Sequence, residues 1–372
     1  MSAISGPEDG PVAVTGASGF IGSEVVTNLV AHGYNVRACV RDASREDKVS
    51  YLLELNDQGS GSVELYSCDL AKANDGSYDE AFAGCSAVFH VAANIGTDKS
   101  YGKNTPQDVY QGLLDATGGV LESCRKAGTV KRLIYTSSTA AVFGPREKGH
   151  YNTWRYENHV FTEDDWAGGS YETLEERHII TDDNGEEQHT WNIETQAYDK
   201  GKLDTEKMAY EYGAQHGIDV ITVCPCHVLG PLKGKVHHVL WQRRLGLMLG
   251  GTTDFPPEGF SWNIIDTRDI AETQRLAATS DVAQNGSRYL MVAADESGEP
   301  TTDMVIDMLR ELFPDIDIAG GYYPPRASHR LYAKCTKAIE ELGLKPHDIK
   351  DTLRVTGETL IKHGCIEPEY KK

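Results

Sequence analysis

The stretch PVAVTGASGFIGSEVVTNLVAHGYNVRACVRD (residues 11–42) predicts a strand, a glycine-rich turn, a helix and a second strand. The apolar run at residues 12–15 is the expected first strand. Three glycines follow it at G-x-x-G-x-x-G spacing: Gly16, Gly19 and Gly22. The apolar residues of the expected helix recur with a period near 3.6: Ile21, Val25, Val26, Leu29 and Val30. Gly33 is placed to end this helix, and NVRACV (residues 35–40) is the second strand.

This order of elements is typical of a dinucleotide site. The first glycine permits a tight turn, the second lets the backbone approach a pyrophosphate, and the third lets helix and strand pack closely. The helix N-terminus then faces the phosphates. Because the chain has 37 glycines, the spacing alone is weak evidence, and the alternative is a structural turn. Its place between strand and helix makes us expect a cofactor on these residues: Gly16, Ser18, Gly19, Phe20, Ile21 and Gly22.

The end of the second strand bears on which dinucleotide binds. NAD sites place an acidic residue there for the ribose hydroxyls, whereas NADP sites place a cation for the 2′-phosphate. Arg41 occupies this position, and three other cations lie nearby: Arg37, Arg45 and Lys48. A guanidinium fork suits a phosphate, so we expect NADP, used as NADPH. Asp42 leaves NAD as the alternative, and the cations could instead be solvated surface charges.

Further strands alternate with helices along the chain. The expected strands are SVELYSCDL (62–70), SAVFHVAANI (86–95), VKRLIYTSSTAAVFG (130–144) and GIDVITVCPCHVLGP (217–231). A helix is expected around residues 108–127, and another carries Tyr198. This alternation predicts an α/β fold with a doubly wound, Rossmann-type parallel sheet, whose ligands bind at the carboxyl ends of the strands.

Composition excludes several classes of protein. Hydrophobic content of 40% and charged content of 25% are ordinary for a globular protein. A net charge of −20 argues against nucleic acid or an anionic membrane as a partner. No apolar run approaches the roughly 20 residues of a membrane span, and the N-terminus does not read as a secretory signal. We therefore expect a cytoplasmic monomer or homodimer.

The cysteines and histidines do not indicate a metal site. None of the eight cysteines shows C-x-x-C spacing, so we expect reduced core thiols. The proline inside CPC (224–226) gives poor chelating geometry. His237 and His238 lie in a polar stretch without a second ligand pair, and we expect both at the surface.

A tyrosine and a lysine one helical turn apart suggest the chemistry. Tyr198 is the only one of 18 tyrosines with a lysine four residues later, Lys202. Residues i and i+4 share a helix face, so Lys202 meets Tyr198 while Lys200 points elsewhere. A nearby ammonium lowers the pKa of a phenol toward the working pH, as a general acid requires. The strand LIYTSSTA delivers hydroxyls to the same sheet edge, where one of them can hold a carbonyl oxygen.

The chain resembles an extended short-chain dehydrogenase/reductase. Within that superfamily it is similar to the group of dihydroflavonol reductases, cinnamoyl-CoA reductases and aldehyde reductases. The resemblance lies in these stretches: VTGASGFIG, VRACVRD, CDL, GCSAVFHVAA, KRLIYTSS, YDKGK, CPCHVLGP and CTKAIEELGLKP. It runs from about residue 11 to about residue 365.

The resemblance implies a role for each matching residue. Tyr198 would be the general acid, Lys202 its partner and a ligand of the nicotinamide ribose, and Ser138 the hydroxyl that polarises the carbonyl. The other cofactor contacts would be Arg41 and Lys48 on the 2′-phosphate, Asp69 and Leu70 at the adenine, Val91, Ala92 and Ala93 in the cleft, and Pro225 and Val228 at the nicotinamide. A different alignment of SSTAAVFG would put Thr139 in the place of Ser138.

An acidic insertion is the main departure from the family pattern. Residues 146–196 carry 13 acidic and 4 basic side chains, a net charge of −9. Five aromatic residues argue against a purely disordered tract: Trp154, Tyr156, Trp166, Tyr171 and Trp191. We expect a partly ordered flap at the mouth of the site, whose field would disfavour multiply anionic substrates; the alternative is a solvated excursion.

These observations divide the chain into two parts. Residues 11–231 are the expected NADP-binding domain, to which 262–290 returns with Asp266 and Asp269 near a helix start. Residues 232–261 and 293–372 are the expected substrate-binding lobe. Four apolar residues of this lobe are expected in a helix core: Leu245, Leu247, Met248 and Leu249.

The predicted function is an NADPH-dependent reductase of a small aldehyde or ketone, without a metal. A nucleotide-sugar epimerase or dehydratase using NAD is the alternative, although Thr139 and Ala140 stand where a dehydratase would carry Asp-Glu. A hydroxysteroid dehydrogenase is a close relative of the leading prediction. A cofactor-binding sensor without turnover is a third possibility, which the intact Ser138, Tyr198 and Lys202 argue against.

Overall fold

A computed structural model describes residues 3–93, 105–143, 160–167, 193–251, 262–293, 299–318 and 332–371, with only the backbone of 193–196 and 332. The backbone of 179–181 and 187–189 is described as well. Several residues predicted to form a flap therefore lie outside the described part, including Trp154, Tyr156, Tyr171 and Trp191.

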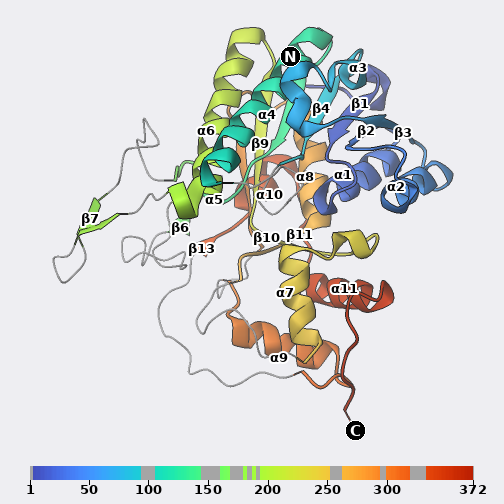
Figure 1. Cartoon of the computed structure of the whole chain (residues 1–372), viewed down its shortest axis with the longest axis vertical. Coiled ribbons are helices and arrows are strands. Elements are labelled where there is room, and N and C mark those ends of the chain that lie inside the picture. Colours follow the sequence, from blue (N-terminus) through green and yellow to red (C-terminus); the bar gives the residue numbers. More distant parts are fainter. Residues whose placement is uncertain are drawn as a thin grey trace.

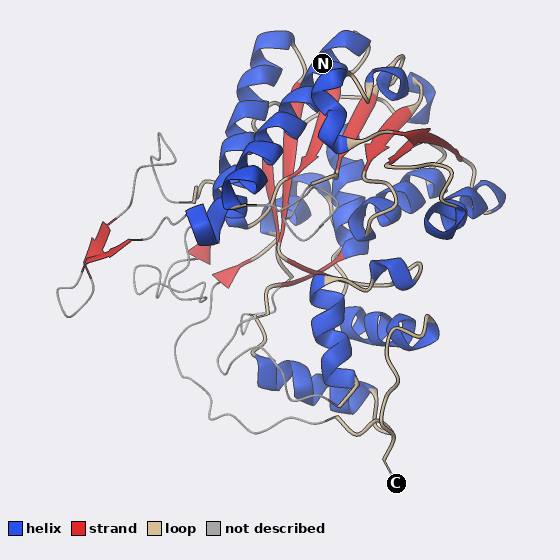
Figure 2. Cartoon of the chain, viewed as in Figure 1, coloured by secondary structure: helices blue, strands red, loops and turns tan. Residues whose placement is uncertain are grey.

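A seven-stranded parallel sheet forms the centre of the larger part of the molecule (Figures 1 and 2). Its strands in chain order are β1 (Val12–Thr15), β2 (Asn35–Val40), β3 (Ser62–Ser67), β4 (Ala87–His90), β5 (Arg132–Thr136), β9 (Asp219–Pro225) and β12 (Arg288–Met291). In space they lie in the order β3-β2-β1-β4-β5-β9-β12, and every pair is parallel. The strand order reverses between β1 and β4, where doubly wound folds bind their ligands. The predicted fold class is confirmed.

Helices cover both faces of this sheet (Figure 2). One face carries α1 (Phe20–Ala31), α2 (Glu46–Leu53), α8 (Thr267–Thr279) and α10 (Thr336–Leu342). The other carries α3 (Asp79–Phe82), α4 (Pro106–Ala127) and α6 (Ile193–His216), with α5 (Ala140–Phe143) beside α6. Helix α4 begins two residues earlier than predicted because Thr105 and Asp108 form a capping box around Pro106.

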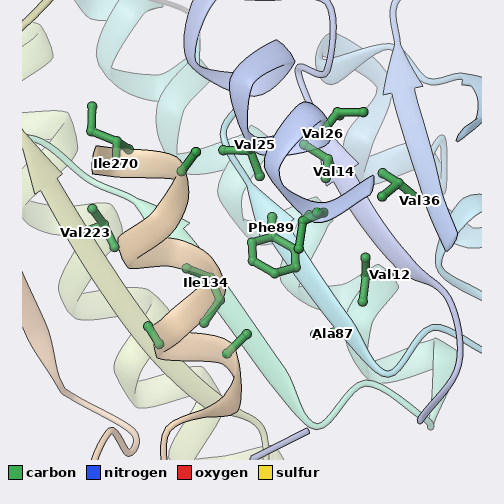
Figure 3. Packing of buried hydrophobic residues seen from close by; sticks show 14 of the residues in the cluster. Val12, Val14, Val25, Val26, Val36, Ala87, Phe89, Ile134, Val223 and Ile270 are labelled. Carbon is green, nitrogen blue, oxygen red and sulfur yellow. The ribbon is translucent and has the colours of Figure 1, made fainter. Parts of the chain in front are cut away.

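The strand side chains alternate between two cores, as a pleated sheet requires. Val12 and Val14 of β1 pack against α1 and α8, whereas Ala13 packs on the opposite side. Figure 3 shows the first core, with Val12, Val14, Phe89, Ile134 and Val223 from successive strands beside Val25 of α1 and Ile270 of α8. Burial of these residues on both faces explains the near-continuous apolar runs in the sequence.

A smaller lobe lies beyond the carboxyl ends of the strands (Figure 1). It contains α7 (Leu240–Leu249), α9 (Thr302–Leu312) and α11 (Ile349–Lys362). The parallel pair β10 (His227–Leu229) and β11 (Ile264–Asp266) connects it to the sheet. The segment predicted as lobe at 293–372 divides: α9 and α11 pack with α7, whereas α10 packs on the core of the large sheet.

Two predicted burial states are wrong. His237 lies in a short 3₁₀ turn (Lys235–His237) and is 1% exposed, because its ring packs against Phe20 and hydrogen-bonds to Ser18. Leu247 faces outward and is 36% exposed, while its predicted companions Leu245, Met248 and Leu249 are buried. Leu247 lies on the outer face of α7, because an amphipathic helix buries the side chains of only one face.

Only parts of the acidic insertion are described. Strand β6 (Val160–Phe161) pairs with β13 (Tyr332–Ala333), and residues up to Ala167 run beside the sheet edge at β12. The backbone hairpin of β7 (Ile179–Thr181) and β8 (Glu187–His189) extends away from the sheet, at the left of Figure 1. None of the eight cysteines, all of them described, forms a disulfide. In the described residues no helix has the length and apolar character needed to cross a membrane.

Candidate functional site

The glycine turn after β1 leaves a cradle that only glycine permits. Gly16 has a φ of +66°, and a Cβ there would stand 2.9 Å from Cα of Ala92. A Cβ on Gly22 would lie 2.1 Å from the carbonyl oxygen of Gly16. Gly19 is the N-cap of α1, and no side chain caps the helix. The helix N-terminus therefore presents its backbone N–H groups at the turn, which suits a pyrophosphate.

The other predicted residues of this turn lie at its surface. Ser18, Phe20 and Ile21 are half-buried, and Gly19 is exposed. The carbonyl oxygen of Ser18 accepts hydrogen bonds from the Tyr51 hydroxyl at 3.0 Å and His237 Nε2 at 3.2 Å. Burial lowers the pKa of His237 to about 4, so this imidazole is neutral at neutral pH. The turn is thus fixed by α2 on one side and by the smaller lobe on the other.

The segment after β4 folds over the same turn. Thr15 Oγ1 accepts hydrogen bonds from the backbone N–H groups of Val91 and Ala92, both at 3.1 Å. The same hydroxyl lies 2.8 Å from His90 Nδ1, to which it can donate. These bonds hold Val91, Ala92 and Ala93, all half-buried, beside Gly16 at the switch point of the sheet. The sequence predicted this neighbourhood.

The predicted adenosine-side residues follow β2 and β3. Arg41 and Lys48 are exposed, the first directly after β2 and the second in α2. Asp69 and Leu70 follow β3; the Asp69 carboxylate accepts from the backbone of Ala71 at 3.1 Å. The parallel register of β2 and β3 brings these two strand ends together at one edge of the sheet.

Two of the neighbouring cations have other structural roles. Arg37 donates to the carbonyl oxygens of Ala81 and Ala83 and lies over the Tyr66 ring. Arg45 forms a 2.9 Å ion pair with Asp47 at the surface. Arg41 directly follows β2 and Lys48 lies in α2, so their place in the fold is the one the sequence assigned to the phosphate ligands.

Lys202 is buried beneath Tyr198 at the carboxyl end of β5. Its side chain is 2% exposed, and Nζ donates to the Thr136 carbonyl oxygen at 2.9 Å and to the Tyr135 hydroxyl at 3.5 Å. Nζ lies 6.0 Å from the centre of the Tyr198 ring. Lys200 points away, as predicted, and pairs with Asp204 at 2.8 Å. Helix α6 thus places one of the two lysines under the tyrosine.

The pKa of the Tyr198 phenol departs from the prediction. Burial raises it above the usual value, and this effect outweighs the lowering by Lys202 and by the Ser138 side chain. Burial also lowers the pKa of Lys202, against the opposing effects of Tyr198 and Glu206. The sequence indicated the sign of the Lys202 effect but not the burial that exceeds it. With a raised pKa the phenol keeps its proton at neutral pH but gives it up less readily, and the Lys202 ammonium opposes that change.

Of the three successive hydroxyls after β5, Ser138 is the one beside Tyr198. It is half-buried, and its hydroxyl interacts with the phenol. Ser137 instead points inward and donates to Glu206 at 2.5 Å. Thr139 is 2% exposed and its backbone N–H donates to the Pro225 carbonyl oxygen at 3.0 Å. This geometry favours Ser138 over Thr139 as the hydroxyl that meets a carbonyl.

Pro225 and Val228 lie beside this turn. Pro225 ends β9 and is buried, and Val228 in β10 is 8% exposed. The Val228 carbonyl oxygen accepts from Gln242 Nε2 at 2.7 Å, which fixes α7 of the smaller lobe to this strand. The predicted nicotinamide border therefore lies where the sheet meets the lobe.

Sequence reasoning missed a buried ion pair under the site. Glu206 and Arg288 lie 2.6 Å apart, and their side chains are 0% and 4% exposed. Glu206 is four residues after Lys202 on α6, so the i+4 spacing that joined Tyr198 to Lys202 could have indicated it. No spacing in the sequence indicated Arg288 as its partner, because Arg288 lies in β12, far from α6 along the chain.

Comparison with known proteins gives similarities over most of the chain. Residues 12–159 match the NAD dependent epimerase/dehydratase family. The dihydroflavonol 4-reductase of Hordeum vulgare is 34% identical over 309 residues, which are 83% of this chain and 77% of that protein. The bifunctional dihydroflavonol 4-reductase/flavanone 4-reductase of Malus domestica is 35% identical over 227 residues, 61% of this chain. The match spans only 56% of the length of the Malus domestica protein.

A solved structure is similar along nearly the whole chain. Yeast methylglyoxal/isovaleraldehyde reductase, complexed with NADPH, superposes with a TM-score of 0.73. The match covers 96% of this chain and 100% of the yeast chain at 22% identity. At that identity the similarity shows the fold.

Proposed function

Because the chain belongs to the NAD-dependent epimerase/dehydratase family, within its dihydroflavonol-reductase-like group, we propose that it is an NADPH-dependent carbonyl reductase. The observation that carries the proposal is that Tyr198 lies close both to the Ser138 hydroxyl and to the buried Lys202. This group of side chains stands at the carboxyl edge of the sheet, beside the strand whose end adjoins the glycine turn. The substrate class is a small neutral aldehyde or ketone.

The residues present fit a bound dinucleotide phosphate. Gly16, Gly19 and Gly22 with the N-terminus of α1 would hold the pyrophosphate, because a side chain at Gly22 would collide with the backbone of Gly16 and force the turn open. Arg41 and Lys48 would hold the 2′-phosphate. Around the rest of the cofactor we place Asp69 and Leu70 at the adenine, Val91, Ala92 and Ala93 along the cleft, and Pro225 and Val228 at the nicotinamide.

NADPH, when bound, supplies the hydride that forms the new C–H bond at the carbonyl carbon. Ser138 and Tyr198 hold the carbonyl oxygen by hydrogen bonds, which fixes the carbon for attack. Tyr198 then gives its proton to that oxygen, so the C=O double bond becomes an alcohol. The phenolate left behind is stabilised by the Lys202 ammonium until it recovers a proton from water. Lys202 would also hold the ribose hydroxyls of the bound cofactor.

The described part of the insertion bears on the substrate. Glu163, Asp164 and Asp165 lie in the segment that runs beside β12, and Ala167 bonds to the carbonyl oxygen of Ala141, three residues after Ser138. An acidic segment this close to the turn disfavours anionic carbonyl compounds. The division into a nucleotide domain (11–231 with 262–290) and a substrate lobe (232–261 with 293–372) remains our proposal, except that α10 belongs with the sheet.

The test is NADPH oxidation against a panel of aldehydes, ketones, keto-esters and flavonoid-type ketones. We expect turnover with neutral members of the panel and a preference for NADPH over NADH. Tyr212→Phe is the matched control for Tyr198→Phe, because Tyr212 lies on the same helix and donates to Glu122 far from the site. Purified protein that retains NAD and oxidises no NADPH would instead support the epimerase alternative.

A further inference from the structure

Glu206 is a fully buried carboxylate that connects four elements of the fold. It is 0% exposed, on α6, one turn after Lys202. Its Oε2 accepts from the Ser137 hydroxyl at 2.5 Å, on the turn after β5. Its Oε1 accepts from Thr222 in β9 at 2.9 Å and Arg288 in β12 at 2.6 Å. The Tyr210 hydroxyl on α6 donates to the same oxygen at 3.1 Å.

Arg288 extends this network to residues 163–165, which belong to the described part of the insertion. Its guanidinium donates to the carbonyl oxygens of Glu163 at 2.8 Å and Asp165 at 2.6 Å, and a longer bond of 3.4 Å reaches Ala141. The Trp166 ring lies 3.7 Å from the guanidinium carbon. One ion pair therefore fixes two carbonyl groups of the insertion and one carbonyl group of α5.

A buried ion pair is weak evidence for stability, because desolvation opposes the attraction of the charges. The arrangement around Glu206 indicates another purpose. Its Ser137 partner immediately precedes Ser138, and its helix carries Tyr198 and Lys202. The carboxylate thus joins the two segments whose side chains must meet one carbonyl oxygen.

We propose that Glu206 is a positioning residue, which fixes the Ser138 turn to the helix of Tyr198 and Lys202 and, through Arg288, fixes residues 163–165 to the same helix. This inference rests on the proposed reductase function. A displacement of about 1 Å at a reacting group can cost roughly a hundredfold in rate. A rigid connection between Ser138 and Tyr198 therefore explains why a charge is buried here in spite of its desolvation.

The charge of Glu206 has a second effect, on the protonation of Lys202. The groups that face Lys202 are Tyr198 and Glu206 from α6, Tyr135 from β5, His90 from β4 and Cys224 from β9. Burial lowers the Lys202 pKa, and the Glu206 carboxylate opposes that change. Loss of the negative charge would let Lys202 give up its proton at lower pH, whereas a purely geometric change near Ser138 would not.

The first experiment compares Ser137→Ala with Thr222→Val. Each variant removes one hydroxyl that donates to Glu206, but only Ser137 lies on the turn of Ser138. We expect Ser137→Ala to lower kcat by about tenfold or more with little change in substrate KM, and Thr222→Val to stay within about twofold of wild type. Equal effects of the two variants, or no effect of Ser137→Ala, would overturn the proposal.

The second experiment measures the pH profile of kcat/KM for Glu206→Gln, with circular dichroism to confirm folding. We expect its alkaline limb to move to lower pH by about 1 unit, while Ser137→Ala keeps the wild-type limb. An unmoved limb in a folded Glu206→Gln protein would remove the electrostatic part of the inference. If this variant does not fold, the Ser137 and Thr222 pair decides alone.

The outcomes also separate this inference from the proposed function. If the wild-type protein turns over no carbonyl compound, the proposed function is contradicted. If the wild type is active, Tyr198→Phe is inactive and Ser137→Ala is fully active, only the role of Glu206 is contradicted. Binding of NADPH, followed by quenching of protein fluorescence, does not depend on turnover. Because Ser138 meets the carbonyl oxygen and not the cofactor, we expect Ser137→Ala and Thr222→Val both to bind NADPH with the wild-type affinity; weaker binding by Ser137→Ala would move its effect to the cofactor site and count against positioning.

Discussion

The Lys202 ammonium lies 6.0 Å from the centre of the Tyr198 ring and is held there by the Thr136 carbonyl oxygen, 2.9 Å from Nζ. The lysine is thus fixed by strand β5, and not only by its own helix. Lys200, two residues earlier, pairs with Asp204 instead.

Lys202→Met should therefore lower kcat and weaken NADPH binding, each by about tenfold to a hundredfold, the range for losing a charged hydrogen-bond partner. Steady-state kinetics and a binding titration measure the two effects. Lys200→Met is the matched control, because Lys200 lies on the same helix and pairs with Asp204, which still accepts from Tyr110 at 2.6 Å. Similar losses in both variants would show that the effect belongs to the helix rather than to the site.

Arg41→Ala should reduce the preference for NADPH over NADH by about tenfold or more, since one charge-assisted contact to the 2′-phosphate is lost. The ratio of kcat/KM for the two cofactors is the measurement. Arg45→Ala, which removes an exposed pair with Asp47, should leave that ratio unchanged. An Arg41→Ala protein with the wild-type ratio would place the phosphate elsewhere.

Buried histidine should make the protein less stable in acid. Burial lowers the pKa of His90 from 6.5 to about 3, so the folded state keeps this ring neutral while the unfolded chain takes up a proton below pH 6.5. The stability tied to this group is present above pH 6.5 and is lost as the pH falls toward 3, by up to about 1.4 kcal/mol per pH unit. Urea unfolding at pH 7, 6 and 5 measures how the free energy of unfolding falls with pH. This fall should be smaller for His90→Gln than for wild type. Parallel slopes would contradict the buried neutral ring.

Arg132 should matter for stability and not for catalysis. It is 2% exposed and donates to four carbonyl oxygens at the end of α8, at distances of 2.6 to 3.2 Å: those of Ala277, Ala278, Ser280 and Ala283. Arg132→Met leaves these acceptors without their donor and should lower the free energy of unfolding by about 3 kcal/mol or more. Lys131→Met, which removes an exposed pair with Asp9, should change it by less than about 1 kcal/mol. Equal stability of the two variants would contradict this role of Arg132.

The sequence predicted the parts of the site that follow a local period. The glycine turn, the parallel strands and the shared face of Tyr198 and Lys202 each follow from spacing along one element. The identity of the hydroxyl beside Tyr198 could not be predicted from spacing, because Ser137, Ser138 and Thr139 are chemically alike. The bond of the Ser137 hydroxyl to Glu206 and the burial of Thr139 separate these two residues from Ser138.

Contacts between segments far apart in the sequence explain where the prediction and the structure differ. His237 looked like a surface residue because its neighbours are polar, but the turn at Ser18 and the ring of Phe20 bury it from more than 200 positions away. Arg288 is paired by Glu206, 82 positions earlier in the chain. The raised pKa of Tyr198 likewise depends on burial by the whole fold, which a four-residue spacing does not contain.

The most direct measurement follows deuterium from NADPH deuterated at the nicotinamide C4 into the product of an accepted ketone, by mass spectrometry. Wild-type protein should place one deuterium on the former carbonyl carbon. Tyr198→Phe should form that alcohol about 10²- to 10⁴-fold more slowly, while Tyr212→Phe matches wild type. No deuterated alcohol from any carbonyl compound, or an equal rate with Tyr198→Phe, would contradict the account.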